Sequence, residues 1–401
     1  MHLKIALVTS TNKWVQPQLY FGVAASAQPE LKLESGTVSA QVDPWSKIEA
    51  FQTVTKVNPD ANSVELSNGK TFNYKALVLA PGFEHSMDNI EGLDALSKTP
   101  EEDNVFVHML DHKERVDRNF YNGWNHQNGD MICYSPKAPY KGEGSDFYAL
   151  WYEHYLRQDR MHGRAAANAR IQYWTPNKEI FQFPYANEVA LDECHKRGID
   201  VMFGWEMLAV KQHENGAKVA TFRNVETGET IEKDFNHLNI NPPSNAPGLL
   251  RDSGLSASNG LLDVNKYTLQ HNKYENIFGF GDAVAFDTTR TMNAAMAQEP
   301  IVKNNVLRFL QGKDINGVYN GYSWMPFYLG HSQASNFQHL HDYEPAPMNH
   351  YVPHYGIFSR FYFGRMMKSQ LGAANNYGGI KKDHGPPYGK FAAEYDELEH
   401  N

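Results

Sequence analysis

Strand-like and helix-like stretches alternate between residues 131 and 203 of this chain. Three short apolar runs, at 131–134, 171–174 and 200–203, are strand-like. The stretches between them, 147–160 and 186–197, are helix-like, and the first has apolar residues at helical spacing. This β-α-β-α-β order predicts a parallel sheet joined by crossover helices.

Further elements are predicted on both sides of this unit. Residues 3–8 form a short apolar strand, and residues 77–79, Leu-Val-Leu, have the continuous apolar character of a buried strand. Residues 48–57 and 62–66 alternate apolar and polar side chains around an Asn-Pro-Asp-Ala-Asn turn, which predicts a hairpin. Residues 292–310 are expected to form a long helix that a glycine stops.

Composition excludes several classes of protein. The length of 401 residues allows two or three domains with a sizeable core. A formal net charge of −9 argues against a nucleic-acid partner, because phosphate binding needs clustered Lys and Arg. The two cysteines, Cys133 and Cys194, form no C-x-x-C motif, so neither a disulfide framework nor a cysteine zinc site is expected, and both are interpreted as small buried apolar residues. No apolar run is long enough to predict a membrane-spanning helix.

Two motifs are typical of flavoproteins with two dinucleotide folds. Residues 71–82 form an apolar strand that ends in Ala-Pro-Gly, and residues 274–283 end in the Gly281-Asp282 pair. With these motifs, the order of several stretches resembles sulfide:quinone oxidoreductases, especially the mitochondrial kind, within the flavoprotein disulfide-reductase-like superfamily. The stretches that carry the resemblance span most of the chain: 16–22, 135–144, 241–247, 261–265, 268–271, 291–298 and 322–326.

The resemblance implies an α/β fold of two interleaved Rossmann-like units of the FAD/NAD(P)-binding type, with parallel sheets. Residues 1–105 and 263–330 would form the first unit, a degenerate FAD-binding-type domain. This unit would lack its first strand and helix, because the chain begins at what resembles the second strand. Residues 106–262 would form the second unit. Residues 331–401, rich in Tyr, Phe and His, would form an extended tail that faces a membrane or a partner.

The residues that carry redox chemistry in the family are replaced here. The family uses two cysteines that take up sulfide sulfur and pass electrons to FAD. In this sequence Gly142 and Met325 stand at the two matching positions. Neither side chain can form or exchange a disulfide, so no catalytic residue is expected.

Only some of the residues that bind FAD in the family are expected to be present in this sequence. The resemblance assigns Gly82, Gly281 and Asp282, together with the amino end of the helix that begins Met292-Asn293, to the flavin. The glycine-rich turn that binds the pyrophosphate is absent from the sequence. We therefore expect FAD binding to be weak or absent.

No other cofactor is expected. The second unit opens with two prolines where a dinucleotide-binding turn needs glycines, which argues against NAD. Five histidines occur late in the chain, without acidic or cysteine neighbours at metal-ligand spacing, and are interpreted as solvated loop residues rather than a metal site: His331, His339, His341, His350 and His354.

Residues 355–368 match the part of the family that attaches to membranes. They combine aromatic with basic side chains, so peripheral contact with a bilayer and contact with a protein partner are both open.

Three functions are compatible with the sequence. The first is an inactive pseudoenzyme that serves as an accessory or structural subunit of a mitochondrial, inner-membrane-associated protein complex. The second is an FAD-dependent oxidoreductase of the sulfide:quinone type whose amino-terminal segment is missing from this sequence. The third is a binding module that uses the flavin cleft for another ligand.

Overall fold

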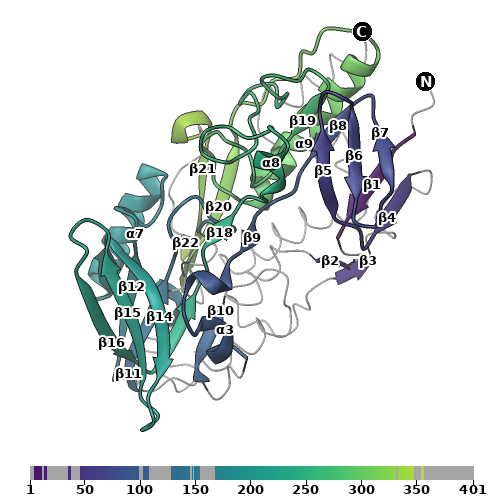
Figure 1. Cartoon of the computed structure of the whole chain (residues 1–401). Helices are drawn as coiled ribbons and strands as arrows, with labels where there is room; N and C mark the ends of the chain where they lie inside the picture. Colours follow the sequence, from purple (N-terminus) through teal and green to yellow (C-terminus); the bar gives the residue numbers. More distant parts are fainter. Residues whose placement is uncertain are drawn as a thin grey trace.

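The computed structural model describes residues 4–10, 13–15, 35–37, 46–98, 103–107, 128–144, 147, 149–153, 168–330, 333–346 and 354–355. These residues form two α/β units at the two ends of an elongated molecule (Figure 1). The fold class expected from the sequence, two interleaved Rossmann-like units with parallel sheets, is confirmed.

The second unit contains the parallel sheet predicted from the alternating pattern. Its five strands, all parallel, follow the order β10 (Val105–Val107), β17 (His237–Ile240), β11 (Asn128–Tyr134), β12 (Asn168–Thr175) and β13 (Asp200–Phe203). The helices are α6 (Ala149–Glu153) and α7 (Pro184–Lys196). The rest of the helix expected over 147–160 lies outside the described residues.

The two faces of this sheet pack against different elements. Side chains alternate along β11, so Met131 and Cys133 lie in one core cluster with residues of α6 and α7, whereas Ile132 and Tyr134 lie in another. The second cluster is closed by Phe222 and other residues of an antiparallel sheet. Its strands are β14 (Trp205–Gln212), β15 (Lys218–Asn224) and β16 (Thr230–Phe235).

The first unit combines strands from the amino-terminal part of the chain with a strand that follows much later in the sequence. β1 (Ala6–Thr9) pairs in parallel with β4 (Lys47–Ala50), and β8 (Leu77–Leu79) pairs in parallel with β19 (Ile277–Gly279). Within the described ranges, no ladder joins these two pairs.

An antiparallel meander lies beside them. It consists of β5 (Val54–Asn58), β6 (Ser63–Leu66) and β7 (Thr71–Asn73). The predicted hairpin turn between β5 and β6 is confirmed. The prediction of one strand over 48–57 is wrong, because Phe51 takes a positive φ of 59° and the chain turns there. Residues before this turn therefore join β1, and residues after it join β6.

The helix α9 (Met292–Leu310) has the predicted bounds and packs on β19 and on β20 (Ser323–Gly330). β20 forms an antiparallel sheet with β21 (Gln333–His339) and β22 (His354–Tyr355). Residues 333–346, expected to begin a separate tail, thus pair with β20, and Phe337 is buried in the main core. Apart from 354–355, residues 347–401 lie outside the described part, as does the expectation of a partner or membrane contact there.

Short elements complete the fold: β2 (Lys13–Val15), β3 (Ser35–Thr37), β9 (Glu84–His85), η1 (Met87–Asn89), α3 (Leu93–Leu96), β18 (Ser244–Asn245), α8 (Leu249–Asp252) and η4 (His341–Tyr343). β9 pairs with β18 where the chain passes between the two units (Figure 1). No described helix is both long and apolar enough to cross a membrane.

Candidate functional site

The candidate site lies where the two units meet. Glu143, on the loop after β11, is a buried acid with 7% of its surface exposed. Its Oε2 accepts a hydrogen bond of 3.2 Å from the backbone N–H of Arg290, on the loop before α9. The loops that the sequence assigned to redox chemistry and to the flavin are therefore in direct contact.

The amino end of α9 is capped at this junction. Thr291 is the N-cap residue, and its hydroxyl oxygen accepts a hydrogen bond of 3.2 Å from the N–H of Ala294. Met292 begins the helix as predicted, and Asn293 is buried in its first turn.

A buried chain of polar side chains continues from this cap. Hydrogen bonds join Thr291 to Ser323 (3.1 Å), Ser323 to Thr289 (2.6 Å), and Thr289 to Nε2 of His339 (3.2 Å). Nδ1 of His339 lies 2.8 Å from the carbonyl oxygen of Leu340. Because a carbonyl only accepts, Nδ1 donates and Nε2 accepts from the Thr289 hydroxyl. Burial lowers the pKa of His339 to about 4, so its ring is neutral at pH 7.

His339 corrects the interpretation of the late histidines as solvated loop residues. It is buried in β21, and His341 is half-buried with Nε2 2.9 Å from the carbonyl oxygen of Tyr319. His331 and His350 lie outside the described residues. Within the described ranges, no three His, Cys, Asp or Glu side chains gather as metal ligands.

The two glycines assigned to the flavin follow neighbouring strands. Gly82 follows β8 and Gly281 follows β19, with positive φ of 67° and 86°. A Cβ built on either glycine meets no described atom within 4 Å. The N–H of Gly281 donates to Oε1 of Gln298 at 2.8 Å, so a side chain of α9 holds this turn.

Asp282 is a half-buried acid beside these glycines. Burial raises its pKa to about 6, although the positive charges of Arg290 and Lys141 act in the opposite direction. A carboxyl group with this pKa changes charge close to neutral pH.

Arg290 carries a buried positive charge on the loop before α9. Its guanidinium donates to the carbonyl oxygens of Val284, Phe286 and Thr288, at 3.3, 3.3 and 2.7 Å. The guanidinium carbon also lies 6.0 Å from the centre of the Phe83 ring. Arg290, only 4% exposed, therefore ties the loop before α9 to the turn after β8.

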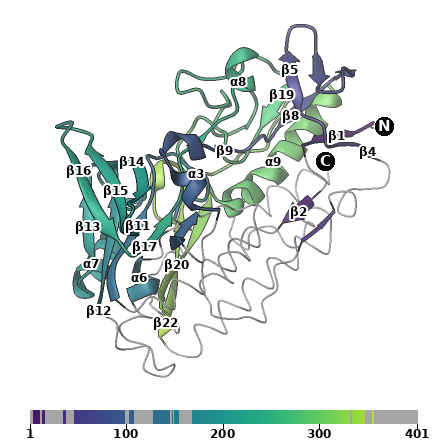
Figure 2. The same ribbon diagram turned by 60° about the horizontal axis from the view of Figure 1, so that its bottom comes forward.

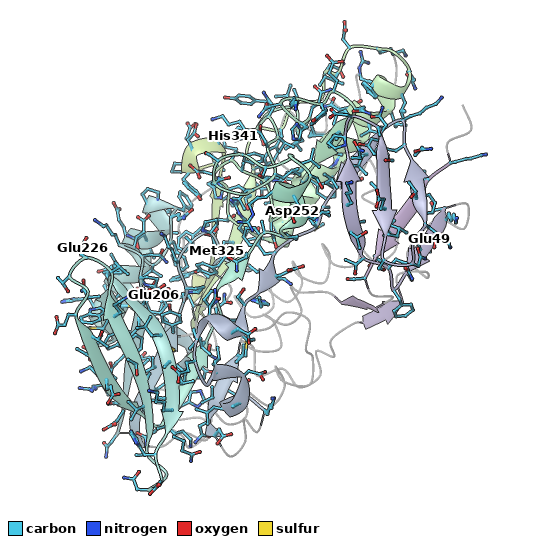
Figure 3. The ribbon with its side chains drawn as sticks, viewed as in Figure 1. Glu49, Glu206, Glu226, Asp252, Met325 and His341 are labelled. Atoms are coloured by element: carbon cyan, nitrogen blue, oxygen red, sulfur yellow. The ribbon has the colours of Figure 1, made fainter. Side chains whose placement is uncertain are left out.

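Met325, in β20, lies in the middle of the molecule (Figure 3). A Cβ on Gly144, which has φ of 82°, would stand 1.8 Å from the Sδ of Met325 and 2.9 Å from its Cγ. The two segments expected to carry the redox pair are therefore brought together. Gly144, two residues after the predicted Gly142, faces the methionine sulfur.

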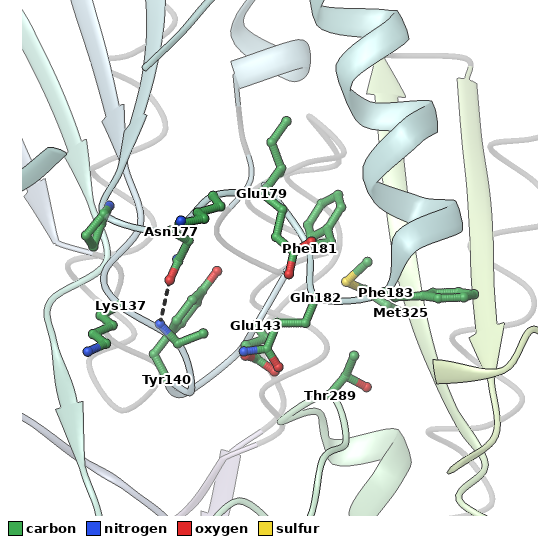
Figure 4. A pocket seen from close by; sticks show the side chains of 14 residues that line it. Lys137, Tyr140, Glu143, Asn177, Glu179, Phe181, Gln182, Phe183, Thr289 and Met325 are labelled. Atoms are coloured by element: carbon green, nitrogen blue, oxygen red, sulfur yellow. Dashed lines mark hydrogen bonds between the residues drawn. The ribbon is translucent and has the colours of Figure 1, made fainter. Parts of the chain in front are cut away.

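A pocket of about 340 Å³ opens beside this contact (Figure 4). Residues 137–143 and 176–183, the loops at the carboxyl ends of β11 and β12, form most of its wall, with Thr289 and Met325 completing it. This is the edge at which parallel α/β sheets bind ligands. Its lining mixes aromatic rings with the buried carboxyl group of Glu143.

Neither cysteine lines this pocket. Cys133 is buried in β11 and Cys194 in α7, which confirms their interpretation as small core residues. Burial also raises the pKa of Cys194 to about 12, so its thiol stays protonated at neutral pH.

Glu143, Gly144 and Arg290 were not singled out from the sequence. The sequence signal for Glu143 was its position between two glycines. A solvated acidic residue in a loop gives the same signal, so only the fold distinguishes the two. Arg290 stands in a loop, and only the packing shows that its charge is buried.

The fold is that of the flavoprotein disulfide-reductase-like proteins. A solved sulfide:quinone oxidoreductase from Aquifex aeolicus superposes with a TM-score of 0.72 at 16% identity, covering 94% of this chain and 86% of that one. A chain in the structure of the Tetrahymena thermophila mitochondrial ATP synthase is more similar. Its TM-score is 0.83 at 26% identity, with 96% and 91% of the two chains covered.

By sequence, the chain is similar to mitochondrial sulfide:quinone oxidoreductases. The enzyme of Schizosaccharomyces pombe is 25% identical over 313 residues, and that of Mus musculus is 25% identical over 283 residues. These matches include 77% and 70% of this chain but 64% and 60% of the relatives. The chain thus spans less than two thirds of the length of these curated relatives. No family model matches it.

Proposed function

We propose that this chain is a catalytically inactive relative of the sulfide:quinone oxidoreductases, which acts as an accessory or structural subunit of a mitochondrial, inner-membrane-associated protein complex. The observation that carries the proposal is the contact between Gly144 and Met325. A thioether lies where the chemistry requires a thiol, and a glycine faces it.

The balance of sulfur chemistry supports inactivity. Oxidation of sulfide through a cystine needs two cysteine sulfurs: hydrosulfide attacks one of them to form a persulfide, the S–S bond breaks, and the other sulfur leaves as a thiolate. The Met325 sulfur already carries two carbon substituents and cannot become a thiolate. Cys133 and Cys194 lie in the core of the second unit, away from the pocket wall.

Two comparisons support the cellular setting. The curated relatives are mitochondrial enzymes, and the ATP synthase chain matches almost the whole of this one. A subunit of a large membrane assembly needs surfaces that bind other subunits, but it needs no turnover. In this proposal the binding partners of the chain are the other protein subunits of the complex. Nucleic acid is not a partner.

Sulfide turnover tests the proposed inactivity. Protein purified natively is given sulfide and a soluble quinone, and quinone reduction is followed by absorbance. We expect the rate to equal that of buffer alone. Turnover that thiol alkylation abolishes would show that a cysteine carries the reaction and would overturn the proposal.

Native electrophoresis tests the structural role. We expect the chain, detected with an antibody in gently solubilised mitochondrial membranes, to migrate with a large complex. Migration at the mass of the chain alone, 45.6 kDa, would contradict an accessory-subunit role.

The second candidate is an FAD-dependent oxidoreductase, and one observation favours it. Gly82 and Gly281 leave open space beside the partly buried Asp282, as a cradle for a ribityl chain would. Bound FAD would supply hydride chemistry there, with Asp282 and the amino end of α9 holding it. In the structural proposal, FAD binds weakly or not at all, and neither NAD nor a metal binds. Flavin absorbance of the natively purified protein distinguishes the inactive subunit from the FAD-dependent enzyme.

A further inference from the structure

The pocket shown in Figure 4 has a wall whose groups are held in place by other residues. The ring of Phe181 packs edge-on against Phe147, with 5.3 Å between the ring centres, and against Phe327, with 5.9 Å. The side-chain oxygen of Asn177 accepts a hydrogen bond of 3.0 Å from the N–H of Ala138, which ties the loop after β12 to the loop after β11. The wall is therefore formed before any ligand enters, as in most small-molecule sites.

The acidic side chains that line this pocket are more buried than the basic ones. Glu143 is buried and Glu179 is half-buried, whereas Lys137 and Lys178 are exposed. The Nζ of Lys178 also lies 3.1 Å from a carboxyl oxygen of Glu226, outside the pocket. Because water and salt screen exposed charges more than buried ones, the carboxyl groups dominate the electrostatic potential inside the pocket.

Two further basic residues lie in the same region without lining the pocket. The charges of Arg290 and Lys141 both act on Asp282. The guanidinium of Arg290 donates to three carbonyl oxygens of the preceding residues, and neither basic side chain belongs to the pocket wall. The pocket itself is therefore suited to a positively charged ligand.

The rest of the lining is largely aromatic and apolar. Tyr140, Phe181 and Phe183 contribute rings, and Met325 contributes a thioether (Figure 4). Aromatic rings attract cations, and they also pack against apolar groups. A phosphate group, in contrast, would meet buried carboxyl groups where it needs backbone N–H donors. This combination favours a cation that carries an apolar group.

We propose that this pocket binds a small organic amine in its protonated form. The ammonium group lies at Glu143, and the apolar part of the amine packs against the rings of Tyr140, Phe181 and Phe183. The cavity of about 340 Å³ is at the small end of the range for ligand sites, so the amine carries a single ring or an apolar group of similar size. This binding needs no redox chemistry, so it is independent of the proposed role as a subunit.

Three probes of similar size test whether charge decides binding. Benzylamine is cationic at pH 7, benzyl alcohol is neutral and benzoate is anionic, and each has one phenyl ring. Their binding to the full chain is measured by saturation-transfer NMR titration. We expect benzylamine to bind about tenfold more tightly than benzyl alcohol, because only the cation makes a charge-assisted hydrogen bond to a carboxylate, and benzoate to bind more weakly than either. Absence of benzylamine binding, or equal affinity of benzylamine and benzyl alcohol, overturns the inference.

The variant Glu143→Gln tests where the ammonium group binds, since it keeps the size of the side chain and removes its charge. We expect the affinity for benzylamine to fall about tenfold and the affinity for benzyl alcohol to stay unchanged. Glu188→Gln is the matched control, because Glu188 is an exposed acid of α7 that does not line the pocket. It should leave both affinities unchanged. An equal loss of benzylamine affinity in the two variants would reflect the net charge of the chain and would overturn the site.

The variant Glu179→Gln provides a second test that does not depend on the folding of Glu143→Gln. Glu179 lines the same pocket but is only half-buried, so we expect its loss of charge to lower the affinity for benzylamine less, by about threefold. Benzylamine affinity that neither variant lowers would place the amine elsewhere and overturn the inference. Sulfide turnover would overturn the proposed inactivity and leave these affinities unaffected, so the two proposals fail separately.

Discussion

Met325 and Gly144 depend on each other. The absence of a Cβ at position 144 makes room for the methionine sulfur, and the buried methionine leaves no space for a larger residue there. The thioether of Met325 thus fills space that a side chain at position 144 would otherwise need. A return to thiol chemistry would require both positions to change together.

Substitution of Gly144 measures this dependence. Gly144→Ala should destabilise the protein by about 2–4 kcal/mol, because it combines an unfavourable positive φ with a clash against Met325. Gly216→Ala is the matched control, since Gly216 has φ of 84° and open space, so only the backbone cost of about 1–2 kcal/mol applies. Urea unfolding of both variants gives the difference. Equal losses would show that Met325 moves aside without cost.

Asp282 makes the stability of the folded chain depend on pH. Its pKa is raised from 3.8 to about 6, so folding is penalised while the carboxyl is ionised, and the penalty disappears as the pH falls below both values. Asp282→Asn should therefore stabilise the protein by about 2–3 kcal/mol at pH 8 and by almost nothing at pH 3.5. Unfolding free energies of both proteins across this range provide the test. A constant difference would show that the substitution acts through packing.

At the scale of elements, local signals decide which predictions succeed. Thr291 and Gly312 bracket α9, and the bounds of that helix follow from them. The break between β4 and β5 has no such signal, because Phe51 is an apolar residue in a turn. The pairing of β20 with β21 has no such signal either, because Pro326 and Gly330 interrupt the alternation that is typical of a strand.

The N-cap residue of α9 contacts residues outside the helix as well as the helix itself. Thr291 accepts the N–H of Ala294 and contacts Ser323, which continues the polar chain to His339. Thr291→Ala should cost about 1–2 kcal/mol, as loss of an N-cap does, whereas Thr291→Ser keeps the hydroxyl and should lose less than half of that. Thermal unfolding of the two variants measures it. Equal losses would assign the effect to the Thr291 methyl group.

At the scale of the whole molecule, the sequence predicts the order of the segments better than their meeting points. The motif order alone singles out Gly82, Gly281, Asp282 and Met325 as candidate residues. The hydrogen bond between Glu143 and Arg290 joins residues 147 positions apart in the chain, and no local sequence pattern predicts it. The contact between Gly144 and Met325 likewise depends on how two loops from different units pack. Such contacts are set by tertiary packing, so a single sequence leaves them open.

Flavin binding is the property that tests the whole arrangement. Gly82, Gly281 and Asp282 would contact only one part of a bound FAD. A glycine-rich turn, which would bind the pyrophosphate and contribute much of the affinity, does not occur among these 401 residues. We therefore expect about 100 μM FAD to raise the melting temperature of the isolated chain by less than about 1 °C, because a ligand near its Kd adds only about 0.4 kcal/mol. A rise of several degrees that Asp282→Ala abolishes and Asp252→Ala preserves would contradict this, since Asp252 lies in α8, outside the cradle. In that case the chain binds flavin with the cradle alone, and the flavoenzyme candidate gains over the structural one.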